Sequence, residues 1–118
     1  IRETRLQYAQ QNYSTTLSKK SIRALLANTK VYIRDGSFFG SGRDNANAAL
    51  LRVIATAPDH DKVPGLQKQL IEEVVEAVIE LAGTGDLRRA KLIVNTALEH
   101  FPEHAELKRL QGHINSLS

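Results

Sequence analysis

One amphipathic pattern, which lies between a glycine turn and a proline at residues 85–102, constrains the fold of this chain more than any other feature. Small or apolar residues recur in it at steps of three and four, which places them on one face of a helix. Asp86 can accept hydrogen bonds from the free N–H groups of the first turn, and Pro102 cannot continue the helical ladder. We therefore predict a helix that is bounded at both ends and whose apolar face consists of Leu87, Ala90, Val94, Ala97, Leu98 and Phe101.

The same spacing occurs once more, earlier in the chain. In both places the pattern follows another helical pattern and a turn that contains glycine. The matching sets are Ala46, Leu50, Val53 and Pro58 in the first copy and Ala90, Val94, Ala97 and Pro102 in the second. Self-similarity of this kind predicts stacked helical hairpins, each of which buries its apolar stripe against a neighbour.

The remaining apolar patterns predict an all-α chain of stacked antiparallel helical hairpins. Gly36 can end the first long helix, and Asp44 can cap the helix that follows it. Pro64 is tolerated in the first turn of the longest helix. Residues 1–17 are predicted to be an N-terminal helix or the remnant of a linker. We expect a single helical domain at residues 18–118, with hairpins at about 18–58 and 63–102 and a capping helix at about 103–117.

This pattern resembles the tetratricopeptide repeat family over roughly residues 22–102. The residues that match the family's small, aromatic, glycine and proline positions are Tyr32, Gly36, Ala46 and Pro58 in the first copy and Gly85, Leu87, Ala90, Ala97 and Pro102 in the second. Leu81 and Val94 stand where the family prefers aromatics, about five extra residues follow Phe38, and the family's first-helix Trp and Gly are absent. A generic stack of α-hairpins would share much of the pattern.

The resemblance implies that the first helix of each hairpin lines a concave groove, which holds an extended peptide or a partner helix. The groove residues that it assigns by repeat position are Arg23, Leu26, Lys30, Ile33 and Arg34 from the first copy and Glu72, Val75, Ile79 and Ala82 from the second. The groove would then have a basic end, an apolar floor and a single acid. Alternatively, residues 1–17 or a second copy of the chain fill it.

Two smaller features bear on binding. Lys30 and Arg34 are four residues apart, so they either grip a carboxylate, such as the C-terminus of a peptide, or remain solvated charges. Phe38 and Phe39 lie in a glycine-rich loop, where one is expected to pack onto the hairpin and the other to contact a partner.

No residue set has the context of a catalytic or metal site. His100 and His104 have ligand spacing, but Pro102 interrupts the helix between them. The loop from Gly36 to Gly42 lacks the Gly-Lys-Ser/Thr ending of a phosphate-binding loop. The acidic series beginning at Glu72 has the spacing of the solvated face of a long helix. We predict no enzymatic activity, no cofactor and no metal.

Charge is distributed unevenly, since residues 1–59 carry nine Lys/Arg against four Asp/Glu and residues 60–118 carry seven against nine. The chain contains no Cys, which excludes disulfides, and no apolar run approaches the length of a membrane span. We therefore expect a soluble chain, and because it contains no Met and begins at Ile1, we expect it to be a piece of a larger protein. We further expect that protein to be bacterial and multidomain or membrane-anchored, with its compartment open. The predicted function is protein binding by a scaffold. The alternatives are a structural spacer or dimerisation domain and, less favoured, a binder of nucleic acid or an anionic surface through the basic N-terminal half.

Overall fold

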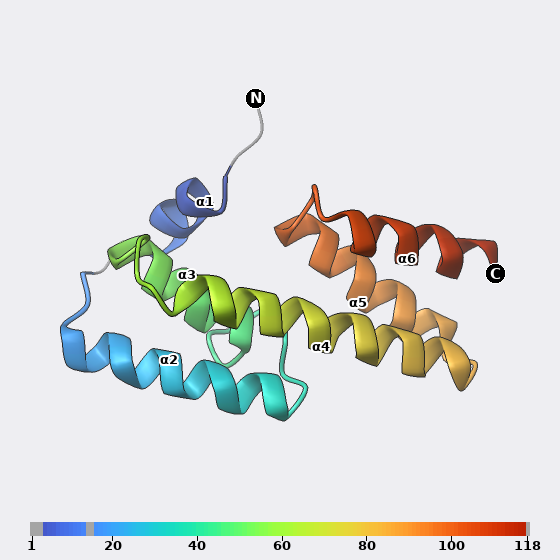
Figure 1. Ribbon diagram of the computed structural model, residues 1–118, viewed down its shortest axis with the longest axis horizontal. Helices are drawn as coiled ribbons and strands as arrows, with labels where there is room; N and C mark the ends of the chain where they lie inside the picture. The colour runs from blue at the N-terminus through green and yellow to red at the C-terminus, as the bar shows by residue number, and fades with distance from the viewer. Residues whose placement is uncertain (1–3, 14–15, 118) are drawn as a thin grey trace. The chain divides into compact units, whose positions relative to one another are not determined.

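The computed structural model describes residues 4–13 and 16–117, in which all regular secondary structure is α-helical (Figure 1). The predicted all-α class is therefore confirmed. Predictions for residues 1–3, 14–15 and 118 lie outside the described residues. The described ranges contain α1 (Arg5–Asn12), α2 (Lys19–Arg34), α3 (Ala46–Thr56), α4 (Val63–Gly83), α5 (Leu87–His100) and α6 (Ala105–Ser116).

The chain divides into two compact units, Ile1–Leu70 and Ile71–Ser118. Helix α4 runs across the boundary, so its first turns belong to the first unit and its last turns to the second. The boundary therefore falls inside the predicted second hairpin. Helices α2 and α3 of the predicted first hairpin contact each other within the first unit, and α5 contacts α6 within the second.

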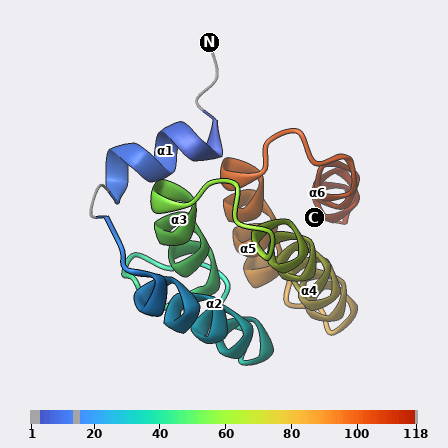
Figure 2. The same cartoon turned by 60° about the vertical axis from the view of Figure 1, so that its left-hand side comes forward.

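Helix α3 is the centre of the first unit. Both α1 and α2 contact it, and Figure 2 shows α3 between these two helices. A helix that is covered from more than one side has little room for a polar face. Accordingly, its buried residues extend beyond the single apolar stripe that the spacing predicts, to Asn47, Ala48 and Leu51.

Glycine closes α2 as predicted. Gly36 has φ 76, the N–H of Ser37 donates to the carbonyl of Tyr32, and the N–H of Gly36 donates to the carbonyl of Ile33. This pair of bonds is the Schellman motif, in which a left-handed residue satisfies the last carbonyls of a helix. The chain then returns to α3, because the carbonyls of Ser37 and Phe38 accept from the first N–H groups of that helix.

The cap of α3 differs from the prediction. Asn45, and not Asp44, is the N-cap, because its Oδ1 accepts from the N–H of Ala48 at 2.9 Å. Its Nδ2 also donates to the carbonyl of Gly42 at 3.0 Å, so the buried amide ties the loop to the helix. Asp44 is exposed and accepts a long hydrogen bond from the hydroxyl of Tyr32.

Helix α1 begins with a capping box, in which Thr4 and Gln7 exchange side-chain and backbone hydrogen bonds. Arg5 reaches from α1 to the first turns of α4 and donates through Nε to Oε1 of Gln67 at 2.5 Å. Burial lowers the pKa of Arg5 to about 10. Since α1 contacts α3, the described part of residues 1–17 lies on the second helix of the first hairpin and packs there as a helix.

The turn after α4 in the second unit has the same glycine conformation as the turn after α2, but it contains fewer residues. Gly85 has φ 88, and the N–H of Asp86 donates to the carbonyl of Leu81, which again makes a Schellman motif. Asp86 also serves as the N-cap of α5 and accepts from the N–H of Arg89 at 3.2 Å. One short turn therefore ends α4 and starts α5. The buried apolar side chains of the second unit lie on α4, α5 and α6, and they are Val74, Val75, Val78, Ala90, Val94, Ala97, Leu107 and Ile114.

The two proline-terminated helices end in the same local structure. Their C-cap residues, Ala57 and Phe101, have φ/ψ of −135/70 and −131/64, which are conformations favoured before proline. Two residues after each proline, the backbone N–H of a histidine donates to the C-cap carbonyl, and both bonds measure 3.1 Å. The repeat thus extends through Pro58-Asp59-His60 and Pro102-Glu103-His104.

Candidate functional site

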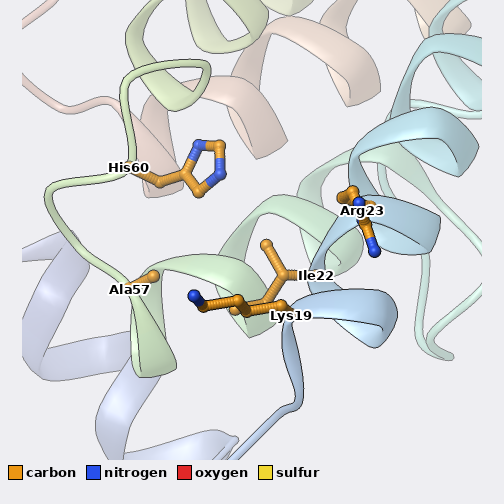
Figure 3. A pocket seen from close by; sticks show the side chains of 5 residues that line it. All are labelled: Lys19, Ile22, Arg23, Ala57 and His60. Atoms are coloured by element: carbon orange, nitrogen blue, oxygen red, sulfur yellow. The ribbon is translucent and has the colours of Figure 1, made fainter.

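The first unit contains an open pocket of about 430 Å³, which we call the basic pocket. Figure 3 shows its five lining residues: Lys19, Ile22 and Arg23 come from the beginning of α2, Ala57 from the end of α3, and His60 from the turn before α4. Ile22 is 8% exposed and supplies an apolar floor together with Ala57. Three of the five lining residues carry basic side chains.

Local hydrogen bonds fix both walls of the basic pocket. On α2, Ser18 is the N-cap, and its side chain accepts from the N–H of Ser21 at 3.1 Å, which places Lys19 in the first turn and Arg23 one turn later. On the opposite wall, Pro58 ends α3 directly after Ala57. The backbone N–H of His60 donates to the carbonyl of Ala57, so the histidine is held beside the floor.

The ring of His60 is oriented by its own turn. Its Nδ1 accepts from the backbone N–H of Lys62 at 3.2 Å, which requires a free lone pair on that nitrogen. The same Nδ1 lies 3.4 Å from Oδ1 of Asp61, to which it could donate only if Nδ1 itself carried a proton. While Nδ1 accepts from Lys62, the ring proton is on Nε2, which is then a donor for an occupant of the pocket.

The charges on α2 are all of one sign. The helix contains five Lys/Arg and no Asp/Glu, and its first turn, where the helix dipole is positive, also lacks an acid. Within the described residues, Lys19, Lys20, Arg23 and Lys30 have no carboxylate partner, whereas Arg34 lies 3.5 Å from Asp35. Asp61, on the His60 turn, is a nearby opposing charge. The basic pocket therefore favours an anionic group that rests on an apolar floor.

The predicted groove residues on α2 separate into two groups. Arg23 lines the basic pocket, and Lys30 and Arg34 are exposed further along the helix. Leu26 and Ile33 are only 5% and 2% exposed, so their side chains belong to the interior of the first unit and offer a partner almost no surface.

The predicted groove residues on α4 also divide. Glu72 is exposed, while Val75 is buried in the interior. Ile79, which is 56% exposed, and Ala82 line a second pocket together with residues of α6. Arg23 and Ile79 therefore line two different pockets, one in each unit.

The glycine-rich loop after α2 places its two aromatic residues differently. Phe38 is 8% exposed and belongs to the interior, while Phe39 is partly exposed. Only Phe39 presents surface to a partner.

Four of the five pocket residues were not assigned to a site from the sequence alone: Lys19, Ile22, Ala57 and His60. The sequence did contain a pattern that could have drawn attention to His60, because the Pro-Asp-His and Pro-Glu-His triplets extend the repeat past its prolines. Lys19 could have been singled out because α2 contains no acidic residue that could pair with it. Ile22 and Ala57 carry no such signal, since they look like ordinary core residues.

Within the described ranges, no cluster of three or more His, Cys, Asp and Glu side chains is suited to hold a metal ion. His104 instead caps α6, since its Nδ1 accepts from the N–H of Leu107 at 3.4 Å. No helix of the described chain combines the length and the apolarity that crossing a bilayer requires. Comparisons with protein-family models, curated proteins and solved structures found no match to this chain.

Proposed function

We propose that this chain is a non-catalytic protein-interaction module that binds an acidic peptide or partner segment in the basic pocket. The observation that carries the proposal is the set of unpaired cations, Lys19 and Arg23, beside the apolar floor made by Ile22 and Ala57. A peptide carboxylate would meet the cations, and a neighbouring apolar side chain would cover the floor.

A tetratricopeptide-like stack is the arrangement that we propose for the module. Three local features support it: the two Schellman turns at Gly36 and Gly85, the two proline-terminated helices, and the matching histidine turns that follow them. In such a stack, α2 would be a first helix and would face the groove. Arg23, Lys30 and Arg34 would then extend the basic surface along a bound peptide.

A random-peptide display selection against the whole chain tests the proposal. We expect the selected peptides to combine Asp or Glu, or a free C-terminal carboxylate, with an adjacent apolar residue. The double variant Lys19→Glu/Arg23→Glu should weaken binding of a selected peptide by about tenfold or more, since two attractive contacts become repulsive. Fluorescence anisotropy with a labelled peptide measures the loss.

The matched control is Arg88→Glu/Lys91→Glu, which changes the net charge equally but alters the first turns of α5. It should bind the selected peptide like the native chain. Equal losses in both variants, or selected peptides without acidic residues, would overturn the proposal. Displacement of the peptide by single-stranded DNA, with a steep dependence on salt, would favour an anionic-surface binder.

A further inference from the structure

The second unit contains an apolar groove of about 500 Å³ between the end of α4 and α6, which we call the acidic-edged groove. Its α4 wall consists of Ile79, Ala82 and Gly83, and its α6 wall includes Leu110 and Leu117. Ile79 and Leu117 are 56% and 49% exposed, which makes them two of the most exposed large apolar side chains in the described chain. Apolar surface of this kind on both walls of a groove marks an interaction site more often than scattered exposed residues do.

The groove has unfilled space at its α4 wall. A Cβ atom added at Gly83 would meet nothing within 4 Å. Gly83 is also the last residue of α4 and does not have a positive φ, so a larger side chain is compatible with its backbone. The space beside Gly83 can therefore accept a side chain from a partner.

Carboxylates border the groove along α4. Glu76 and Glu72 precede Ile79 by three and seven residues, which places all three on one face of the helix, and Glu80 is adjacent to Ile79. All three carboxylates are exposed, and none has an ion pair or hydrogen-bond partner among the described residues. Residues 69–86 contain five Asp/Glu and no Lys/Arg.

The opposite edge has a different charge. On α6, His113 lines the groove and Arg109 lies one turn before it. The negative potential is therefore concentrated on the α4 side, and a partner that fits must place its cations there. An isolated acidic helix face would not define a site, but here it borders an exposed apolar groove.

We infer that the acidic-edged groove binds an amphipathic helix whose apolar face carries anchors at helical spacing and whose flank toward α4 carries Lys or Arg. A helix matches a channel that is walled by two helices, because its side chains fit between theirs. Charge complementarity selects the basic helix over an acidic one. This binding is separate from that of the basic pocket, because the two sites share no lining residue.

Two designed peptides serve as probes. Each is a helical 18-residue peptide with Leu at positions i, i+3, i+4 and i+7, and they differ only in carrying Lys or Glu on the flanks. In a chain that carries Lys19→Ala/Arg23→Ala, which removes the cations that could hold the Glu peptide in the basic pocket, we expect the Lys peptide to bind at least tenfold more tightly than the Glu peptide in fluorescence anisotropy. Raising the ionic strength from about 0.05 M to about 0.3 M should reduce that difference.

Two variants locate the binding. Gly83→Leu fills the groove without changing charge, and we expect it to weaken the Lys peptide by about tenfold, with an unchanged circular dichroism spectrum. Glu76→Lys/Glu80→Lys should weaken the Lys peptide by about tenfold and improve the Glu peptide. Lys19→Glu/Arg23→Glu should leave the affinity for the Lys peptide unchanged, which separates this site from the basic pocket.

Three outcomes would overturn the inference. Equal affinity for the two peptides would remove the charge argument, and normal binding by Gly83→Leu would place the peptide elsewhere. The third is self-association of the native chain in light scattering that Gly83→Leu abolishes, because the occupant would then be a second copy. The inference is supported if Gly83→Leu loses binding of the Lys peptide and if Glu76→Lys/Glu80→Lys binds the Glu peptide more tightly than the Lys peptide.

Discussion

The basic pocket and the acidic-edged groove have similar construction and opposite charge. Each has an apolar floor, is bordered by residues of a long helix, and carries charges that lack partners among the described residues. The first unit contains eleven Lys/Arg against five Asp/Glu, whereas the second contains five against eight. Two helical units with similar turns therefore carry surfaces of opposite charge, because exposed helix positions vary without disturbing the interior.

The largest expected effect comes from substitutions that leave a cavity in the interior of each unit. Leu50 in α3 and Leu107 in α6 are both fully buried, and we expect Leu→Ala at either position to lower the free energy of unfolding by about 3 kcal/mol. Because α4 is one continuous helix that contributes to both units, we expect a single urea transition in both variants. Two resolved transitions, with only one shifted by each substitution, would show that the units unfold separately.

The helix caps offer a sharper comparison between the units. Asn45 is 4% exposed and makes two hydrogen bonds, so Asn45→Ala should cost about 2 kcal/mol in thermal or urea unfolding. Asp86 is less buried and makes one capping bond in its turn, so Asp86→Ala should cost about 1 kcal/mol. Asp86→Asn should recover most of the loss. A larger cost at Asp86 than at Asn45 would contradict the idea that burial separates these caps.

The smallest expected effects distinguish His60 from His104, which occupy the same position after the two prolines. His104→Ala removes the cap of α6 and should lower stability by about 0.5 kcal/mol, without any effect on a peptide bound to the basic pocket. His60→Ala should have a similarly small effect on stability but weaken that peptide about threefold, since His60 lines the pocket. Peptide titrations on both variants provide the check. Equal affinities would remove His60 from the site.

The helices could be predicted from the sequence because their limits are set by local chemistry. Glycine at positions 36 and 85 closes a helix wherever it takes positive φ, and proline at positions 58 and 102 stops one whatever surrounds it. The cap at Asn45 was missed because Asp44 and Asn45 are both good caps. The difference between them depends on how the loop returns to α3.

The binding surfaces were predictable only in part, because burial depends on contacts between distant segments. The repeat resemblance assigned Leu26 and Ile33 to a groove, but both side chains are buried in the interior of the first unit. Leu51 was not expected in the interior, because nothing in the pattern indicated that both α1 and α2 would contact α3. The exposure of Glu72, Glu76 and Glu80 agrees with the solvated face that their helical spacing predicts, since carboxylates without a partner are rarely buried.

The two connections that contain a left-handed glycine, at Gly36 and Gly85, have a practical consequence for engineering the chain. The connection after α4 has no spare residue, because Asp86 both completes one helix end and caps the next. The connection at residues 35–45 is held by the backbone carbonyls of Ser37 and Phe38 and by the side chain of Asn45, which also donates to the carbonyl of Gly42. Residues 40–44 are nevertheless exposed. That stretch is where an epitope tag or a fluorescent reporter can be inserted with least disturbance to either proposed binding surface.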